Sequence, residues 1–399
     1  MTVRLNRFTL VRLVLVFMGL VSLSYGLYIL NQPESLYQAL MVFRVLLLTA
    51  ILLGFSLNPI RIDRWTIFPM IYAGYVLFRS YWGGGNLVVQ TLTILTWPLL
   101  YLFMYSHAAG RPEKNTRQLY LEQRKTNRIL ILFELSLALV CIPLLQRHLS
   151  GNGRAGEVVF PVYFFLTLLP LILYFFPKSK FFWILPCFFI VLSTKRTGIL
   201  TIVFGLFLAQ ISNYHLMDSL RKKARLIWST IVLSAAFAAG FLFVTRSFQL
   251  GILERFLSLS QDGGSGRNEI WASILLHYFD GTTIQRLFGR GFQAVTELKL
   301  TGRAILAHND YLEILYDYGI VGLLLLLAWL VQLAYLYRRA WKAKLAILPS
   351  YTYALCCILF LSVFSYLFIQ SDLMLFMASY LGIATATISA DHKRTVSQP

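Results

Sequence analysis

The sequence predicts an all-α, polytopic membrane protein with about twelve transmembrane helices and one long periplasmic loop. Hydrophobic residues make up 58% of the 399 residues, and charged residues only 13%, roughly half the charged fraction of a soluble domain. Apolar runs of about 17 to 25 residues recur along the chain, each long enough to cross a hydrocarbon core of about 30 Å. A β-barrel would instead show short segments of alternating hydrophobicity.

We expect residues 1–399 to form a single integral membrane domain. The segment 246–319 is too polar and glycine-rich for a span, so we expect a long outer loop there, with short helices near Asn268–Tyr278 and Asn309–Tyr318 that carry part of an active site. The spans are expected to begin near Leu13, Ala39, Thr66, Val88, Ile129, Val158, Phe181, Ile199, Ile227, Ile320, Ala346 and Leu373.

Lysine and arginine are unevenly shared between the two sets of alternating loops. One set holds clusters such as Arg221–Arg225, whereas the opposite short loops hold only Arg147, Arg154, Lys195 and Arg196. This bias predicts that both termini and the loop 111–128 face the cytoplasm. The net charge of +19 therefore indicates membrane topology, and no nucleic-acid partner is expected.

The sequence gives no sign of a metal site or a cofactor. Its cysteines all lie inside apolar runs and are expected to be small core residues: Cys141, Cys187, Cys356 and Cys357. No P-loop, zinc motif or nucleophile elbow is visible. The first apolar run, about 13–30, lacks a clear cleavage site and is interpreted as a retained span.

A polar segment at about 307–319 lies just before the apolar run 323–330. It contains His308 together with Asp310, Glu313 and Asp317. Ionisable groups at the edge of a bilayer indicate a functional site by default, and a neutral imidazole can accept a proton at working pH. The alternative is an incidental histidine in a loop.

Two cationic groups stand on the outer side. Lys195 and Arg196 are exceptions to the rule that positive residues gather in cytoplasmic loops, and their side chains could bind a phosphate or a carboxylate. The alternative is that the two side chains only extend from a helix end toward the membrane surface. Arg267 follows Gly266 in the long loop, and that loop also contains Arg286, Arg290 and Arg303. Several arginines could clamp a pyrophosphate, or could solvate the loop and pair with its acids, Glu254, Glu269 and Asp280.

Three ionisable residues fall inside predicted spans: Arg44, Arg79 and Glu134. An unpaired charge at that depth costs several kcal/mol, so we expect either structural pairing or the lining of a polar lipid-headgroup site.

The chain resembles the bacterial O-antigen polymerase and O-antigen ligase superfamily over about Ile184–Ala340. The resemblance rests on Ser193–Gly198, on Ser265–Arg267 with Trp271 one helical turn later, and on His308–Leu312 followed by Gly319 and Gly322. It implies a C-type, multi-spanning glycosyltransferase fold and a donor on polyprenyl diphosphate. Arg196 and Arg267 would correspond to the family's diphosphate-binding arginines, and His308 to its essential histidine.

On this basis we predict a polymerase of lipopolysaccharide biosynthesis in the bacterial inner membrane. It would be an inverting, metal-independent glycosyltransferase that acts on undecaprenyl-diphosphate-linked oligosaccharide at a periplasmic active site, among membrane lipids, with a chain-length regulator protein as a candidate partner. The alternatives are a ligase that uses lipid A-core and, from another class, a transporter or flippase of a lipid-linked anion. Catalytic roles are assigned to His308, Arg196 and Arg267, and substrate-binding roles to Lys195, Arg290, Arg303, Asn309, Asp310 and Tyr311.

Overall fold

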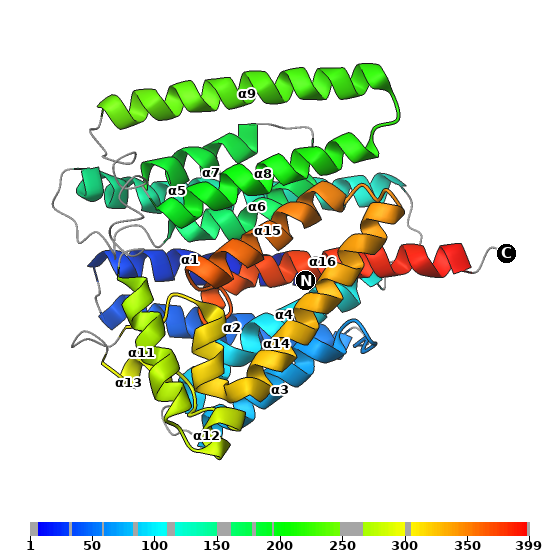
Figure 1. Ribbon diagram of the computed structural model, residues 1–399. Coiled ribbons are helices and arrows are strands. Elements are labelled where there is room, and N and C mark those ends of the chain that lie inside the picture. The colour runs from blue at the N-terminus through cyan, green and yellow to red at the C-terminus, as the bar shows by residue number, and fades with distance from the viewer. Residues whose placement is uncertain are drawn as a thin grey trace.

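The computed structural model contains helices and no strand in the residues it describes, so the predicted all-α class is confirmed. The described residues are 7–31, 34–57, 60–82, 87–109, 116–149, 161–177, 181–193, 195–247, 266–299 and 305–396. Arg303 lies outside them. Each predicted span begins within or close to one of the long helices of a single bundle (Figure 1).

The bundle helices are α1 Arg7–Asn31, α2 Glu34–Leu57, α3 Ile67–Trp82, α4 Leu87–Ala109, α5 Thr116–Leu149, α6 Val162–Phe175, α7 Phe181–Leu192, α8 Arg196–Leu216, α9 Leu220–Ser247, α14 Asp310–Lys342, α15 Leu348–Phe364 and α16 Ser371–Val396. Within the described residues, six helices are long and apolar enough to cross a membrane, in α1, α2, α5, α8, α14 and α16. The protein is therefore a polytopic membrane protein, while the number of about twelve spans stays a prediction.

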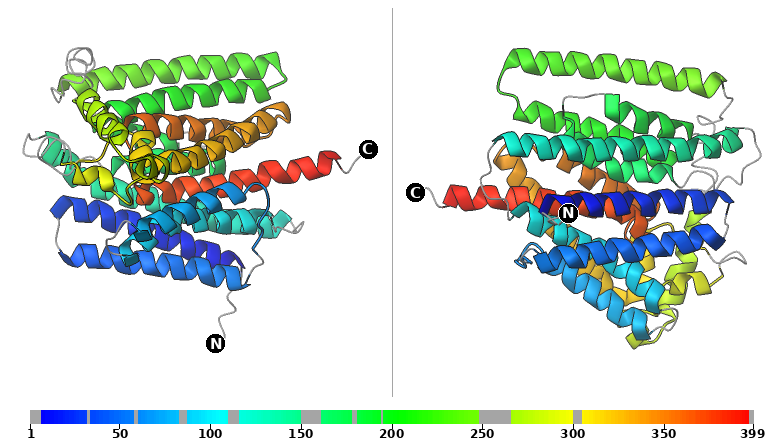
Figure 2. Two further views of the ribbon diagram at one scale, coloured as in Figure 1. Left: turned by 60° about the horizontal axis from the view of Figure 1, so that its bottom comes forward. Right: turned by 180° about the vertical axis from the view of Figure 1, so that it is seen from behind.

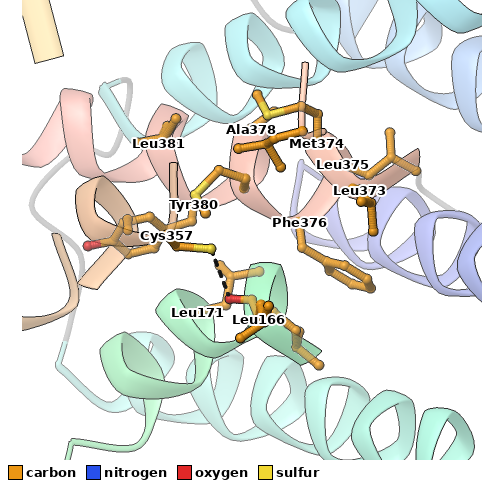
Figure 3. Packing of buried hydrophobic residues seen from close by; sticks show 14 of the residues in the cluster. Leu166, Leu171, Cys357, Leu373, Met374, Leu375, Phe376, Ala378, Tyr380 and Leu381 are labelled. Carbon is orange, nitrogen blue, oxygen red and sulfur yellow. Dashed lines mark hydrogen bonds between the residues drawn. The ribbon is translucent and has the colours of Figure 1, made fainter. Parts of the chain in front are cut away.

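Helix α16 is the centre of the bundle, since 89% of its apolar window is buried. It packs closely on α4, where a Cβ at Gly382 would lie 2.5 Å from the Tyr101 carbonyl oxygen. Small residues let membrane helices approach in this way. Figure 3 shows the neighbouring packing of α6, α15 and α16, where the Cys357 thiol donates to the Leu166 carbonyl at 3.7 Å. All four cysteines are free and buried, as expected.

The polar loop folds into short helices at one end of the bundle, beside the beginning of α14 (Figures 1 and 2). These are α11 Arg267–Phe279, α12 Thr283–Phe288 and α13 Ala294–Glu297. The first contains the predicted helix Asn268–Tyr278, and its residues Ile270 and Ile274 are buried. The α8–α9 turn and the C-terminal end of α16 lie at the opposite end.

Helix α14 is broken at Gly319, whose φ of 68° lies in the left-handed region. The break frees carbonyl groups that must find other donors. The backbone N–H of Arg290 donates to the Tyr316 carbonyl at 3.2 Å, and that of Gly291 to the Asp317 carbonyl at 2.8 Å. The Tyr75 hydroxyl donates to the Tyr318 carbonyl at 2.7 Å. The α12–α13 connection and α3 therefore fix the bend between the polar segment and the apolar run.

Candidate functional site

His308 sits on a tight turn immediately before α14. Its φ of 52° is unusual for a residue with a side chain, and neighbouring groups hold the turn. The N–H of Ala307 donates to Glu313 Oε2 at 2.6 Å, and the Trp271 indole donates to the Ala307 carbonyl at 2.8 Å. The imidazole stacks on Tyr366, with ring centroids 5.3 Å apart and an interplanar angle of 28°.

Asn309 and Asp310 anchor the start of α14. Asn309 Oδ1 caps the helix by accepting from the N–H groups of Tyr311 and Leu312. Asp310 is fully buried, and its carboxylate accepts from the N–H groups of Leu367, Phe368 and Ile369 at 2.8, 3.0 and 3.4 Å. The Asp310 side chain therefore holds the loop that presents Tyr366 to His308, and the Asn309 side chain is engaged within its own helix.

Arg267 is the first residue of α11, directly after Gly266, whose φ is 75°. Its Nη1 donates to the Phe364 carbonyl at 2.5 Å. The Thr197 hydroxyl, from the first turn of α8, donates to the same oxygen at 3.3 Å. The end of α15 thus joins Arg267 of the long loop to the segment that contains Lys195 and Arg196.

The predicted cationic residues are coupled electrostatically, Arg267 and Lys195 to His308 and Arg196 to Arg267. Burial lowers the pKa of His308 to about 4, with further lowering by the charges of Arg267 and Lys195. Burial also lowers the pKa of Arg267, and the charge of Arg196 adds to this effect. Among the described residues, no carboxylate is one of the charges that shift the pKa of Arg267.

The arrangement suits an anionic ligand next to a neutral base. Arg196 and Arg267 each offer a planar fork of donors that matches phosphate oxygens. With its lowered pKa, His308 is uncharged at neutral pH and can accept a proton. In the part of the chain that the structure describes, no group of three or more His, Cys, Asp or Glu side chains could hold a metal ion.

Arg290, another predicted binding residue, contacts residues other than those around His308. Arg290 donates from Nη2 to the His277 carbonyl at 3.1 Å, and its guanidinium lies 5.0 Å from the Tyr316 ring centroid. Tyr316 is eight residues beyond His308, about 12 Å along an α-helix. These contacts join α11 to α14. Tyr311 is half-buried and packs against the main hydrophobic core.

Sequence reasoning missed Tyr366 and the Phe364 carbonyl. Phe364 is the last residue of α15, and Tyr366 lies in the short connection between α15 and α16, far along the chain from the recognised motifs. The available signal was the polar pair Ser365–Tyr366 between two apolar runs. A single tyrosine there is ordinary for a membrane boundary, so its stacking on His308 required the structure.

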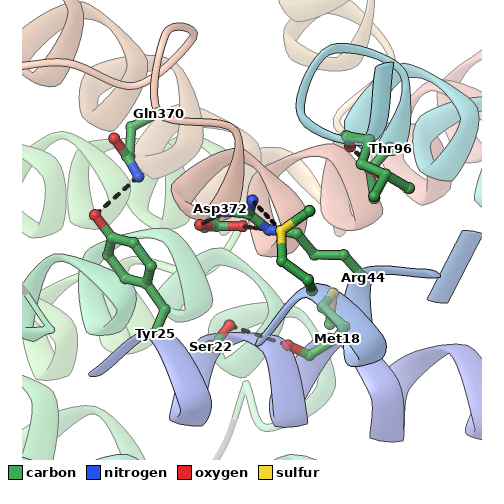
Figure 4. Close-up of polar contacts among 9 residues, drawn as sticks. Met18, Ser22, Tyr25, Arg44, Thr96, Gln370 and Asp372 are labelled. Atoms are coloured by element: carbon green, nitrogen blue, oxygen red, sulfur yellow. Dashed lines mark hydrogen bonds and ion pairs between the residues drawn. The ribbon is translucent and has the colours of Figure 1, made fainter. Parts of the chain in front are cut away.

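The charged residues of the predicted spans have different environments. Arg44 of α2 forms a bidentate ion pair with Asp372 of α16, at 3.2 and 2.5 Å (Figure 4), which confirms structural pairing. Arg79 donates to the Gly289 carbonyl at 2.8 Å, which joins α3 to the long loop. Glu134 is 2% exposed, and its Oε1 has no hydrogen-bond partner among the described residues.

The fold and this site define a polytopic membrane protein with a cationic, histidine-containing site at one end of its bundle. Residues 181–327 match the model of a family described as O-antigen ligase, and this match supports the resemblance to the O-antigen ligase and polymerase superfamily. The matched region includes Arg196, Arg267 and His308. No curated protein matches the chain.

Proposed function

We propose that this protein is a polysaccharide polymerase of the bacterial inner membrane. It would transfer a growing glycan from undecaprenyl diphosphate to the non-reducing end of another lipid-linked repeat unit. The observation that carries the proposal is that the charges of Arg267 and Lys195 act on His308 and that of Arg196 acts on Arg267, within the region that matches a family described as O-antigen ligase. The comparison with that family does not separate a polymerase from a ligase.

The reaction can be written with the side chains present. The acceptor hydroxyl oxygen forms a bond to the anomeric carbon of the donor sugar, and the bond from that carbon to the diphosphate oxygen breaks. The electron pair leaves with the diphosphate, whose charge Arg196 and Arg267 stabilise. His308 takes the acceptor proton. Direct displacement inverts the anomeric configuration, and because the diphosphate is already a good leaving group, no metal is obligatory.

The surrounding contacts serve the positioning of these groups. Tyr366 stacks on the imidazole, and Asp310 holds the loop on which Tyr366 lies. The Phe364 carbonyl orients the Arg267 guanidinium. Holding two reactants in line in this way supplies a large part of the rate enhancement of a transferase.

Purified protein incubated with one lipid-linked repeat unit tests the proposal. A ladder of longer lipid-linked glycans is expected. Glycan on lipid A-core, when that acceptor is supplied, would identify a ligase instead. Movement of the lipid-linked unit across vesicles without any new glycosidic bond would identify a flippase, for which the same arginines would bind phosphate only.

The proposed topology places the His308 site outside and both termini in the cytoplasm, in keeping with the charge bias. Cysteine introduced at Thr283, on exposed α12, should react with an impermeant reagent in spheroplasts. Cysteine at Ser219, on the exposed α8–α9 turn, should react only after permeabilisation. The reverse pattern would contradict the periplasmic site.

A further inference from the structure

A pocket of about 450 Å³ lies at the end of the bundle opposite to His308, where α8, the start of α9 and the end of α14 meet. Its polar and aromatic lining comprises Tyr214, His215, Asp218, Lys223, Trp341 and Lys344. None of these residues takes part in the proposed transfer reaction. The pocket therefore needs an explanation of its own.

Contacts between its residues organise the walls of the pocket. The His215 imidazole stacks on Trp341, with ring centroids 4.0 Å apart and an interplanar angle of 12°. Lys223 Nζ lies 4.7 Å from the Tyr214 ring centroid. Lys344 Nζ forms an exposed ion pair with Asp218 Oδ1 at 2.9 Å. Two ammonium groups are thus held at the pocket beside aromatic surfaces, and the pairing of one of them with Asp218 is open to water.

Lys344 occupies a position that ordinarily favours glycine. Its φ of 49° lies in the left-handed region, directly after the end of α14, and the N–H of Leu345 donates back to the Ala340 carbonyl at 3.0 Å. Helices commonly end in this way with glycine. Strained residues with side chains are a reason to look for a functional role, and the Lys344 side chain reaches the pocket.

The position of the pocket suits the headgroup region of a membrane. Two candidate spans, Arg196–Leu216 and Asp310–Lys342, end at it. Tryptophan and tyrosine are typical of that boundary, and basic pockets between membrane helices bind phosphate-bearing headgroups. Ile211 of α8 lines the pocket, and Phe207 lies one helical turn before it. Both side chains are exposed, so acyl chains could pack on an apolar surface directly beside the pocket.

We propose that this pocket binds the phosphate of an anionic membrane phospholipid, with Lys223 and Lys344 as its ligands and the acyl chains along α8. Binding requires Lys344 to exchange Asp218 for the phosphate. The Asp218 carboxylate thus competes with the lipid for one of its two cationic ligands. This assignment is independent of the proposed transferase reaction.

Native mass spectrometry of the purified protein with added phosphatidylglycerol tests the proposal. The double variant Lys223→Gln/Lys344→Gln should retain at least fivefold less lipid than wild type. Lys222→Gln, the exposed neighbour that does not line the pocket, removes one charge from the same turn and should retain lipid normally. Thermal unfolding of each variant verifies that the fold is kept.

Asp218→Asn is the more stringent test, because this variant is expected to retain more lipid than wild type. With the competing carboxylate neutralised, retention of phosphatidylglycerol should rise. Equal retention in the double variant and wild type would overturn the proposal, as would an equal loss in Lys222→Gln, which would indicate unspecific charge attraction. Displacement of the lipid by millimolar inorganic phosphate would also overturn it, in favour of a free-phosphate site.

Discussion

Arg44 and Arg267 both carry guanidinium groups that are at least partly buried, but the two groups have different partners. Arg44 is 9% exposed and pairs with both oxygens of Asp372. Arg267 is half-buried, donates to a backbone carbonyl and lies near a second arginine. A buried cation that is neutralised inside the protein holds helices together. An arginine that lies near a second arginine is suited to bind an anionic ligand.

The carboxylates show the same division. Asp372 neutralises a cation, whereas Asp310 and Glu313 accept from backbone N–H groups next to the site. The acids near His308 therefore hold the backbone of the site in place.

The largest effect is expected at His308. His308→Ala should lower turnover by roughly a hundred- to ten-thousand-fold, the usual contribution of a positioned base, with normal amounts of protein in the membrane. Turnover is measured as the growth of labelled glycan. His308→Gln can still form hydrogen bonds but cannot take a proton. Normal activity in Gln with loss in Ala would leave His308 with a positioning role only, and activity in both would transfer the base role to Asp310 or Glu313.

Arg44 should affect stability and leave chemistry unchanged. Arg44→Met leaves Asp372 buried without its partner, which typically costs about 3–5 kcal/mol, and the yield and thermal stability of purified protein should fall. The double variant Arg44→Met/Asp372→Leu removes both charges and should recover much of that stability. Turnover per folded molecule should stay close to wild type in both variants. A selective loss of turnover would instead place Arg44 in the site.

A smaller effect is expected for Asp310→Asn. Hydrogen bonds to a charged acceptor contribute about 1.5–3 kcal/mol, and asparagine keeps one of the two acceptor oxygens. We expect about tenfold lower kcat, because the loop with Tyr366 is held less firmly, and a nearly unchanged KM. If KM rises while kcat holds, Asp310 contacts the substrate, as the sequence motif alone suggested.

The smallest effect concerns pH. The neutral form of His308 is the base, and burial together with Arg267 and Lys195 lowers its pKa to about 4. The base is therefore lost only as pH falls through that value, and kcat/KM for the free enzyme should stay level from pH 7.5 to about 5.5. A decline centred near 6.5, the ordinary histidine pKa, would mean that His308 is more hydrated than the structure shows.

Local patterns predicted the helices and the three site motifs because both depend on short stretches of chain. The apolar runs gave the bundle, and the expected short helix Asn309–Tyr318 and the span expected from about Ile320 meet at Gly319, where the structure breaks α14. The contacts of Arg267 with Phe364 and of Asp310 with Leu367 span 97 and 57 residues. No local sequence pattern predicts contacts between residues so far apart, so only the structure shows that the segment between α15 and α16 contributes to the site. For the same reason Arg290 was grouped with Arg267 although its contacts are with His277 and Tyr316.

The most direct test is the affinity of purified protein for a short polyprenyl diphosphate, measured for wild type and for arginine-to-lysine variants. Lysine keeps the charge but loses the paired donors. We predict that Arg196→Lys and Arg267→Lys raise the Kd at least tenfold. Arg290→Lys, on the same loop but apart from His308, should leave the Kd unchanged. Equal affinity in wild type, Arg196→Lys and Arg267→Lys, or an equal loss in Arg290→Lys, would contradict a diphosphate site built around these two arginines.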